Sequence, residues 1–352
     1  MTLKTRTFRT RTLMLSVIIP TLNESDSIAH ILEDLRLQKD VSLEIIVADG
    51  GSADDTLQRI EAFRASHPCL SITDLTTAPG RGHQMNRGAD RARGDHLFFL
   101  HADCRLSHDD QLREALDVLQ AVEVETGNRV AGHFTLEFET TRTDLAELLG
   151  YYEKKSGLNR EGTFNGDQGL LISRSLFRLL GGFSEALPFM EDQELGERLR
   201  TFGSFITLPG KLKTSARRFE KEGSGERIVL NAIIMAMFSL RLMNFFNRAP
   251  GVYRHQGNAR RLQLLPFFRL ATDAICDAGV WMAIRRVFAI GRYITLNAWQ
   301  IALWLEHQYA RDYLTIYDRY IDRLIRNPLG YLLGTLLFVI WYASMRIRLQ
   351  LA

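Results

Sequence analysis

The sequence predicts an α/β fold: a mostly parallel central sheet with helices on both faces, followed by a C-terminal helical extension. Three observations lead to this prediction. In the first part of the 352-residue chain, short apolar and β-branched runs alternate with segments of helical period. These runs are apolar at consecutive positions, as expected for strands that are buried on both faces of a sheet. From about residue 223 onward, long apolar stretches are separated by arginines.

The elements expected before residue 223 follow in a regular order. They are a strand at 15–20, a helix at 27–35, a strand at 43–49, a helix at 51–63, a strand at 94–102, a helix at 107–120, a half-exposed strand at 129–139, a strand, turn and short helix across 169–183, and a helix at 190–203. Ser52 and Ser107 are expected to be N-caps, because an aspartate follows each by three residues. Ligands of such sheets bind beyond the carboxyl ends of the strands, where Asn23, Asp49 and Asp103 fall.

Composition places the chain among globular proteins, with 46% hydrophobic and 24% charged residues. The three cysteines, Cys69, Cys104 and Cys276, have no paired spacing. This argues against a disulfide framework or a zinc site and fits a reducing compartment. The apolar run at 13–20 is too short for a secretory signal, and no small-residue cleavage site follows it. We therefore expect a cytoplasmic protein.

The net charge of +3 conceals a strong asymmetry. Residues 223–352 contain 16 arginines, no lysine and 7 acidic residues, whereas the rest of the chain has 28 basic and 34 acidic residues. Such a basic tail predicts contact with an anionic membrane surface at the inner face of the cell membrane, or else solvated helix faces and ion pairs between domains. Nucleic acid is not expected as a partner, because no binding module for it is recognisable. The expected domains are a basic N-terminal arm at 1–12, an α/β domain at 13–222 and a helical region at 223–352.

Two stretches of the tail are strongly apolar. Residues 228–246 are almost wholly apolar, and residues 329–345 contain no charge and have arginines on both flanks. A helix over 329–345 would be about 26 Å long, slightly short of a hydrocarbon core of about 30 Å. Two alternatives remain open: membrane association, by spanning or by surface insertion, or packing within a helical subdomain.

Short motifs follow the predicted strands in a fixed order: "PTLNE", "DGGSADDT", "GRGHQMNRGADRARGD", "HAD", "GDQG" and "MEDQEL". This succession resembles the inverting family 2 glycosyltransferases, which have the GT-A fold, over roughly residues 14–222. The details "GGS", "GRGHQMN", "LHAD" and "GDQ" resemble most the subgroup associated with arsenosugar biosynthesis and with radical-SAM/selenodomain neighbours. A dehydrogenase is disfavoured, because no G-x-G-x-x-G follows the first strand.

The resemblance implies that the earlier motifs bind a nucleotide-diphospho-sugar donor, with UDP-sugars favoured. The implied donor-binding residues are Pro20, Thr21, Asn23, Glu24, Asp49, Arg81, Asn86, His101, Asp103, Arg217 and Arg218. Asp49 would accept hydrogen bonds from the base edge, because a carboxylate suits an imide or amine N–H. Arg81 would lie near the base and the diphosphate.

The resemblance also implies a divalent metal, Mg²⁺ or Mn²⁺, on the donor diphosphate. Asp103 would be its protein ligand. His101 and Cys104 stand where members of the family carry aspartates, so this site has fewer negative charges than is usual. His101 would hydrogen-bond the ribose, ligate Mn²⁺ through its imidazole, or have only a structural role.

The later motifs are implied to serve the acceptor, whose pocket would contain Gly166, Asp167 and Gln168. Asp192, next to Glu191, would be the general base that deprotonates the acceptor hydroxyl. Because Asp192 begins a helix, we expect it to have a low pKa until bound substrate removes water from it. The expected function is therefore inverting transfer of a sugar from a nucleotide-diphospho-sugar to an acceptor hydroxyl. The alternative is a catalytically weak nucleotide-sugar-binding or scaffolding protein with the same fold.

Overall fold

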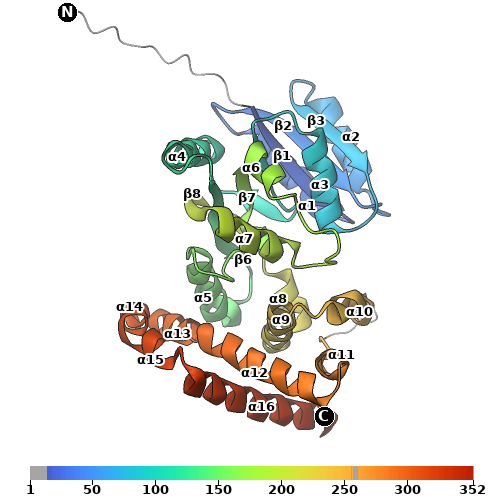
Figure 1. Ribbon diagram of the computed structural model, residues 1–352. Helices are drawn as coiled ribbons and strands as arrows, with labels where there is room; N and C mark the ends of the chain where they lie inside the picture. Colours follow the sequence, from blue (N-terminus) through green and yellow to red (C-terminus); the bar gives the residue numbers. More distant parts are fainter. Residues whose placement is uncertain (1–13, 255, 257–260, 352) are drawn as a thin grey trace, which may run out of the picture. The chain divides into compact units, whose positions relative to one another are not determined.

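The computed structural model describes residues 14–254, 256 and 261–351, and the predicted arm at 1–12 lies outside them. Figure 1 shows its elements, which form two compact units. The sheet unit contains the described residues up to 137 together with 156–214, and the helical unit contains 138–155 and the described residues from 215 onward. The helical unit thus takes in a segment, 138–155, that lies well before the change of composition at residue 223.

The sheet unit begins with alternating strands and helices. They are β1 (Met14–Thr21), α1 (Ser25–Arg36), β2 (Ser42–Asp49), α2 (Thr56–Ser66), β3 (Ser71–Thr76), α3 (Arg81–Arg91) and β4 (His96–Phe99). The elements that follow are β5 (Cys104–Leu106), α4 (Gln111–Thr126), β6 (Val130–Glu139), η2 (Gly166–Gln168), β7 (Leu170–Ser173), α6 (Arg174–Leu179), α7 (Glu191–Phe202) and β8 (Ser204–Ser215).

The eight strands form one sheet in the order β3-β2-β1-β4-β7-β6-β8-β5. The first four are parallel neighbours, whereas β7 is antiparallel to both β4 and β6, and β5 is antiparallel to β8. Strand order reverses at β1, which has β2 on one side and β4 on the other. A crevice for a ligand is expected beyond the carboxyl ends of β1 and β4.

Helices cover the parallel part of the sheet on both faces. Met85 of α3 shares a core with Ile18 of β1 and Phe99 of β4. The intervening positions, such as Val17 and Ile19, point to the opposite face and have no exposed surface either. Burial of both faces confirms the α/β fold with its central sheet and agrees with the continuous apolar runs in the sequence.

Two local predictions are wrong. α2 and α4 begin after Asp55 and Asp110, so neither Ser52 nor Ser107 is an N-cap. The Ser52 hydroxyl instead donates to Asp49 Oδ1 over 2.5 Å, since the turn after β2 uses it to hold that carboxylate. No helix is predicted for residues 81–91, because the face that is buried there carries Gly82, Gln84, Met85, Gly88 and Ala89, of which only Met85 is a large apolar residue.

The helical unit contains no strand apart from the ends of β6 and β8. Its elements are η1 (Thr143–Leu145), α5 (Ala146–Ser156), α8 (Arg217–Glu222), α9 (Ser224–Ser239), α10 (Met243–Arg254), α11 (Leu265–Cys276), α12 (Val280–Leu296), α13 (Trp299–Tyr309), α14 (Tyr313–Ile316), η3 (Tyr317–Ile321), α15 (Asp322–Ile325) and α16 (Pro328–Leu351). Phe245, Phe246 and Phe268 are fully buried within it. The C-terminal helical region predicted from composition is therefore confirmed.

Close packing of α3 on β1 depends on Gly88, where an added Cβ would overlap Ile18 Cγ2. We expect Gly88→Ala to lower the free energy of unfolding by about 1–2 kcal/mol, because overpacking of the core outweighs the better helix propensity of alanine. Gly225→Ala in α9 is the matched control, since a Cβ there meets no atom within 4 Å. Thermal unfolding of both variants tests this, and equal midpoints would contradict the expectation.

Candidate active site

The first part of the site lies where β1 and β2 end side by side, with Thr21 opposite Asp49 in the register. The predicted residues Pro20, Thr21, Asn23, Glu24 and Asp49 all gather there. Asp49 is fully buried, and its Oδ2 accepts hydrogen bonds from the backbone N–H groups of Gly51 (2.9 Å) and Ser52 (2.8 Å). Its Oδ1 accepts from the Thr21 hydroxyl (3.1 Å). The carboxylate of Asp49 is thus occupied by its own turn, and recognition of a base by it stays a prediction.

Arg81 is the first residue of α3, and its Nε donates to Glu191 Oε1 at the start of α7. The side chain of Glu191 is only 1% exposed, whereas that of Arg81 is 30% exposed. Burial alone would lower the pKa of Arg81, but the nearby carboxylates of Glu191 and Asp192 outweigh it and raise that pKa. Arg81 is therefore a permanent cation with one side still open to solvent.

Asp192 follows Glu191 at the start of α7 and is buried. Its Oδ2 accepts from the backbone N–H of Gly166 at 2.5 Å, and its Oδ1 accepts from the N–H of Gln193 at 2.7 Å. Burial and the charge of Glu191 raise the pKa of Asp192, although Arg81 acts in the opposite direction. The expectation of a low pKa is therefore wrong: burial and the neighbouring acid outweigh the favourable end of the helix even without substrate.

The turn after β4 meets the η2 loop at His101. His101 Nδ1 lies 2.9 Å from Asp167 Oδ1. A Cβ added to Gly166 would lie 2.8 Å from both His101 Cε1 and Nε2, and 3.2 Å from Asp192 Oδ2. Residues far apart in the sequence (His101, Gly166, Asp167 and Asp192) are thus brought together beyond the carboxyl end of β4. A histidine held at Nδ1 by a carboxylate keeps its Nε2 for a second partner, and here that nitrogen faces Gly166 in the buried part of the site.

Asp103 is the carboxylate available for a metal. It is half-buried, and the structure gives it no hydrogen bond or ion pair with any described residue. Among the described residues, no group of three or more His, Cys, Asp or Glu side chains is arranged to hold a metal ion. Cys104 lies in β5, and burial together with the nearby Asp103 raises the pKa of its thiol, so it remains a thiol and a poor ligand. Asp103 therefore fits a metal only if donor phosphates supply most of the ligands, as Mg²⁺ allows.

Two of the predicted contacts are wrong, because the side chains concerned are already used within the fold. Gln168 is fully buried, and its Nε2 donates to Ser156 O at 2.7 Å, so it cannot face an acceptor. The amide of Asn86 donates to Phe183 O and accepts from Phe183 N–H, at 2.9 and 2.8 Å, so it fastens a loop and does not bind the donor. Both amides stand in the family motifs, and those motifs do not indicate these bonds.

One residue was not predicted at all. Gln84 of α3 is buried, and its Nε2 donates to Thr21 O and Ala48 O, each at 2.8 Å. It thereby holds the start of α3 against the ends of β1 and β2. The predicted donor residues Arg217 and Arg218 begin α8 of the helical unit, and their contact with a donor stays a prediction.

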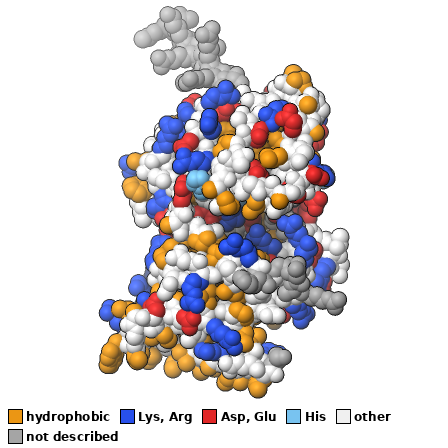
Figure 2. Space-filling model, turned by 90° about the vertical axis from the view of Figure 1, so that its right-hand side faces the viewer, with side chains coloured by type: hydrophobic (Ala, Val, Ile, Leu, Met, Phe, Trp, Pro, Cys, Tyr) orange, Lys and Arg blue, Asp and Glu red, His pale blue; other side chains and the backbone are white. Residues whose placement is uncertain are grey.

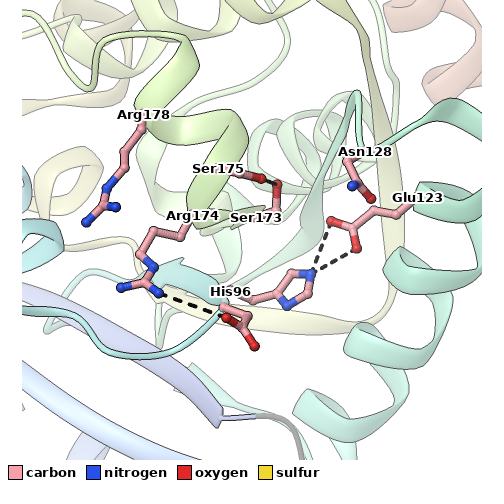
Figure 3. A pocket seen from close by; sticks show the side chains of 8 residues that line it. His96, Glu123, Asn128, Ser173, Arg174, Ser175 and Arg178 are labelled. Carbon is pink, nitrogen blue, oxygen red and sulfur yellow. Dashed lines mark hydrogen bonds and ion pairs between the residues drawn. The ribbon is translucent and has the colours of Figure 1, made fainter.

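A hollow of about 320 Å³ lies at the opposite, amino-terminal end of β4 and is separate from this cluster (Figure 3). His96 and Glu123 line it and form a buried pair, with His96 Nε2 2.9 Å from Glu123 Oε2. Arg174 and Arg178 of α6 also line it, and Figure 3 shows Arg174 directed toward the start of β4. The buried pair joins β4 to α4, so we assign it a role in the fold and not in the chemistry.

Residues 16–181 match the family described as "Glycosyl transferase family 2". Over this range, just under half of the chain, the sequence is similar to glycosyltransferase family 2. Its sheet unit accordingly has the GT-A-like architecture of mostly parallel sheet and surrounding helices, which confirms the expected fold. The match ends before α7, so it does not itself cover Glu191 and Asp192.

Curated proteins named as glycosyltransferases are also similar to part of the chain. The chain is 33% identical over 154 residues to the "Uncharacterized glycosyltransferase YfnE" of Bacillus subtilis. The matched region makes up 40% of this chain and 37% of that protein. It is 37% identical over 99 residues to the "PGL/p-HBAD biosynthesis glycosyltransferase" of Mycobacterium bovis, covering 28% of this chain and 39% of that protein. The chain thus matches less than two fifths of the length of these curated relatives.

Solved structures resemble the chain at low sequence identity. The mannosyltransferase PcManGT from Pyrobaculum calidifontis, solved with GDP-Man and Mn²⁺, is 17% identical with a TM-score of 0.49, covering 94% of this chain and 88% of that one. TarS residues 1–349 of S. aureus, solved with UDP, is also 17% identical with a TM-score of 0.49, covering 88% of this chain and 92% of that one.

Proposed function

We propose that this family 2 protein is an inverting glycosyltransferase that moves a sugar from a nucleotide-diphospho-sugar to an acceptor hydroxyl. The observation that carries the proposal is the buried Asp192 carboxylate with its raised pKa, held among Gly166, His101 and the Arg81–Glu191 pair. A general base needs a pKa nearer to the working pH than that of an ordinary aspartate. Burial and a neighbouring acid supply this property here.

The proposed reaction is a single displacement at the anomeric carbon. The acceptor oxygen forms a bond to that carbon while the bond to the diphosphate oxygen breaks, and the hydroxyl proton passes to Asp192. The nucleoside diphosphate leaves with additional negative charge, which a fixed cation stabilises in a site with little water. Arg81 is the candidate cation, because its guanidinium stays charged and is partly open to solvent.

We further propose that the donor carries UDP and binds with Mg²⁺ or Mn²⁺ at Asp103. A bound divalent metal would neutralise charge on the diphosphate as it leaves. His101 would complete this side of the site, because its Nδ1 is held by Asp167 and its Nε2 faces Gly166 beside Asp192. Thr21, Asn23 and Asp49 would border the nucleoside at the ends of β1 and β2, and Asp167 the acceptor or the transferred sugar.

Replacement of Asp103 tests the metal contact. We expect Asp103→Ala to weaken UDP binding mainly in the presence of Mn²⁺, because metal-free binding does not use this carboxylate. His101→Asp should increase the effect of Mn²⁺ on binding, since a second carboxylate favours a hard cation. Thermal shifts with UDP, with and without Mn²⁺, measure both effects, and Asp109→Ala, which removes a surface pair with Lys39, is the control. If Mn²⁺ has the same effect on all four proteins, Asp103 is not the metal ligand.

The alternative is a nucleotide-sugar-binding or scaffolding protein that turns over poorly. It is favoured by a single observation: the described residues contain no group of three side chains suited to a metal. Incubation with radiolabelled UDP-sugars and GDP-sugars, with Mg²⁺ or Mn²⁺, separates the two. Release of sugar, or its transfer to an added membrane or lysate acceptor, supports the transferase. Binding without release under all these conditions supports the alternative.

We also propose that the protein belongs to the arsenosugar-associated subgroup and that its C-terminal region associates with the inner face of the cell membrane. The motifs "GRGHQMN", "LHAD" and "GDQ" support the subgroup. The membrane proposal is supported by α16, a 24-residue helix, which is the one candidate span by length and composition among the described residues. The arginine-rich composition of residues 223–352 adds attraction to anionic lipid.

A further inference from the structure

α16 is the most exposed apolar element of the helical unit. Its exposed side chains include Leu329, Leu332, Leu333, Leu336, Leu337, Val339, Ile340, Ile347 and Leu351. Hydrophobic side chains gather along the lower edge of Figure 2, where α16 lies in Figure 1. Only Gly334 and Phe338 of this helix are buried. An apolar face of this extent requires a partner.

α16 packs against α12 along a seam of small residues. A Cβ added to Gly334 would lie 2.5 Å from Gly291 O and from Thr295 Oγ1. Nearer the start of α16, the Thr295 hydroxyl donates to Gly330 O at 3.0 Å. Because residue numbers rise along α12 as they fall along α16, the two helices form an antiparallel pair. We call it the α12–α16 pair.

The second half of α16 is fastened to α11. The Tyr342 hydroxyl donates to Phe268 O at 2.7 Å, and the rings of these two residues lie 4.9 Å apart. Arg346 donates to the Thr272 hydroxyl at 3.2 Å. α16 is therefore held to its neighbours at both ends and does not stand alone.

These neighbours are unsuited to the hydrocarbon core. α12 carries Arg285 and Arg292, both exposed, and α11 carries Asp273. A charged side chain at the centre of a bilayer costs about 2.5–3.5 kcal/mol on insertion scales. α16 could cross a membrane only by leaving both helices, which would expose its glycine seam and break the bonds of Tyr342 and Arg346. Its length and composition alone would allow a span, but its packing opposes one.

We infer that the α12–α16 pair is a surface-inserting platform: it lies in the interface of an anionic membrane without crossing it. This inference rests on the membrane association proposed above and specifies its geometry. The apolar face of α16 and the exposed start of α12, with Val280, Trp281 and Ile284, enter the acyl boundary. Arg285 and Arg292 reach the headgroups, since long basic side chains extend toward the polar layer.

Charge favours a lipid surface over a second copy of the chain. α12 and α16 together carry five arginines and no acidic residue. A second α12–α16 pair would bring like charges together, whereas anionic headgroups complement them. The platform therefore selects phosphatidylglycerol-like lipids. Salt should weaken its binding to these lipids but not abolish it, because the apolar contact is not screened.

Binding to vesicles tests the platform. The full-length protein is expected to sediment with vesicles of equal parts phosphatidylcholine and phosphatidylglycerol, and less with phosphatidylcholine alone. Leu333→Glu with Leu337→Glu should abolish sedimentation, and Arg285→Gln with Arg292→Gln should remove the preference for phosphatidylglycerol. Val124→Glu on the sheet unit is the matched control, because that side chain is 86% exposed and belongs to α4. Sedimentation unchanged by the α16 substitutions would overturn the platform.

Labelling in cell membranes separates surface insertion from a span. The exposed native Cys69 reports the side on which the sheet unit lies, in a protein carrying Gln350→Cys and Cys276→Ser. An impermeant maleimide is expected to label both thiols in inverted vesicles and neither in sealed right-side-out vesicles. Labelling of residue 350 from the opposite face would show a span and overturn the inference. If the protein binds no membrane but forms a dimer that the α16 substitutions break, the platform inference is overturned in favour of a second copy. Sugar release measured on the same samples reports separately on the proposed transferase.

Discussion

Asp192→Asn is expected to reduce sugar transfer by roughly 10²–10⁴-fold while leaving the affinity for UDP nearly unchanged. The substitution keeps the size of the side chain and one oxygen to accept from the Gly166 N–H, loses the acceptor of the Gln193 N–H, and removes the proton acceptor of the reaction. The measurement is the initial rate with labelled donor, together with calorimetric titration of UDP. Glu194→Gln is the matched control in the same helical turn, since Glu194 pairs with Arg198 and not with the site. A transfer rate in Asp192→Asn equal to that of the control would remove Asp192 from the role.

The pH dependence of the rate provides a second readout of the same base. Because the pKa of Asp192 is raised, the rate should fall as the pH drops through a value above that of an ordinary aspartate, about 3.9. Glu191→Gln removes the negative neighbour and frees Arg81 to act on Asp192. The acidic limb of the pH–rate profile should therefore move to lower pH. A limb that stays in place would show that Glu191 does not tune the base.

Arg81→Met is expected to lower the free energy of unfolding by about 2–3 kcal/mol at pH 8. Loss of one partner of a buried pair costs about 3–5 kcal/mol, and the value is reduced here because Arg81 is 30% exposed. This loss of stability should be smaller at low pH. Without Arg81 the pKa of Asp192 in the folded variant rises further, so the folded variant takes up a proton more readily than the folded wild type. Proton binding then stabilises the folded variant and reduces the difference from the wild type as the pH falls. Urea unfolding at pH 8 and pH 5.5 measures both effects.

Two comparisons isolate the buried charge. The double variant Arg81→Met with Glu191→Gln should recover most of the lost stability, because the stranded carboxylate is then absent. Arg36→Met removes a solvent-exposed pair with Glu33 and should change the free energy of unfolding far less than Arg81→Met does. Equal losses in Arg36→Met and Arg81→Met, or no recovery in the double variant, would show that the Arg81–Glu191 pair is not an energetically coupled buried pair.

The sequence predicted the sheet well because burial on both faces leaves a continuous apolar run, which β1, β2 and β4 all show. It missed α3, where the helix is stabilised by tertiary contacts of Gly88 and Gln84 and not by its own period. The structure brings together Arg81, Glu191, Asp192 and His101, which the motifs had singled out, while their roles stay predictions.

Side-chain direction was harder to predict than position. Gln168 and Asn86 belong to motifs of the family, yet hydrogen bonds to distant backbone groups turn their amides into the fold. The prediction of a low pKa for Asp192 is wrong for a related reason: a helix start is visible in sequence, but burial of this carboxyl beside Glu191 and Gly166 depends on tertiary packing.

Gly166 limits how far the proposed site can be redesigned. Its missing side chain is the space in which the His101 ring and the Asp192 carboxylate approach each other, since a Cβ there would lie 2.8 and 3.2 Å from their atoms. A larger residue at 166 must displace one of the two, so a library that varies this position alone would yield mostly inactive clones. Changes of acceptor specificity should instead be sought at the exposed side of the same loop, or in libraries that vary positions 101 and 166 together.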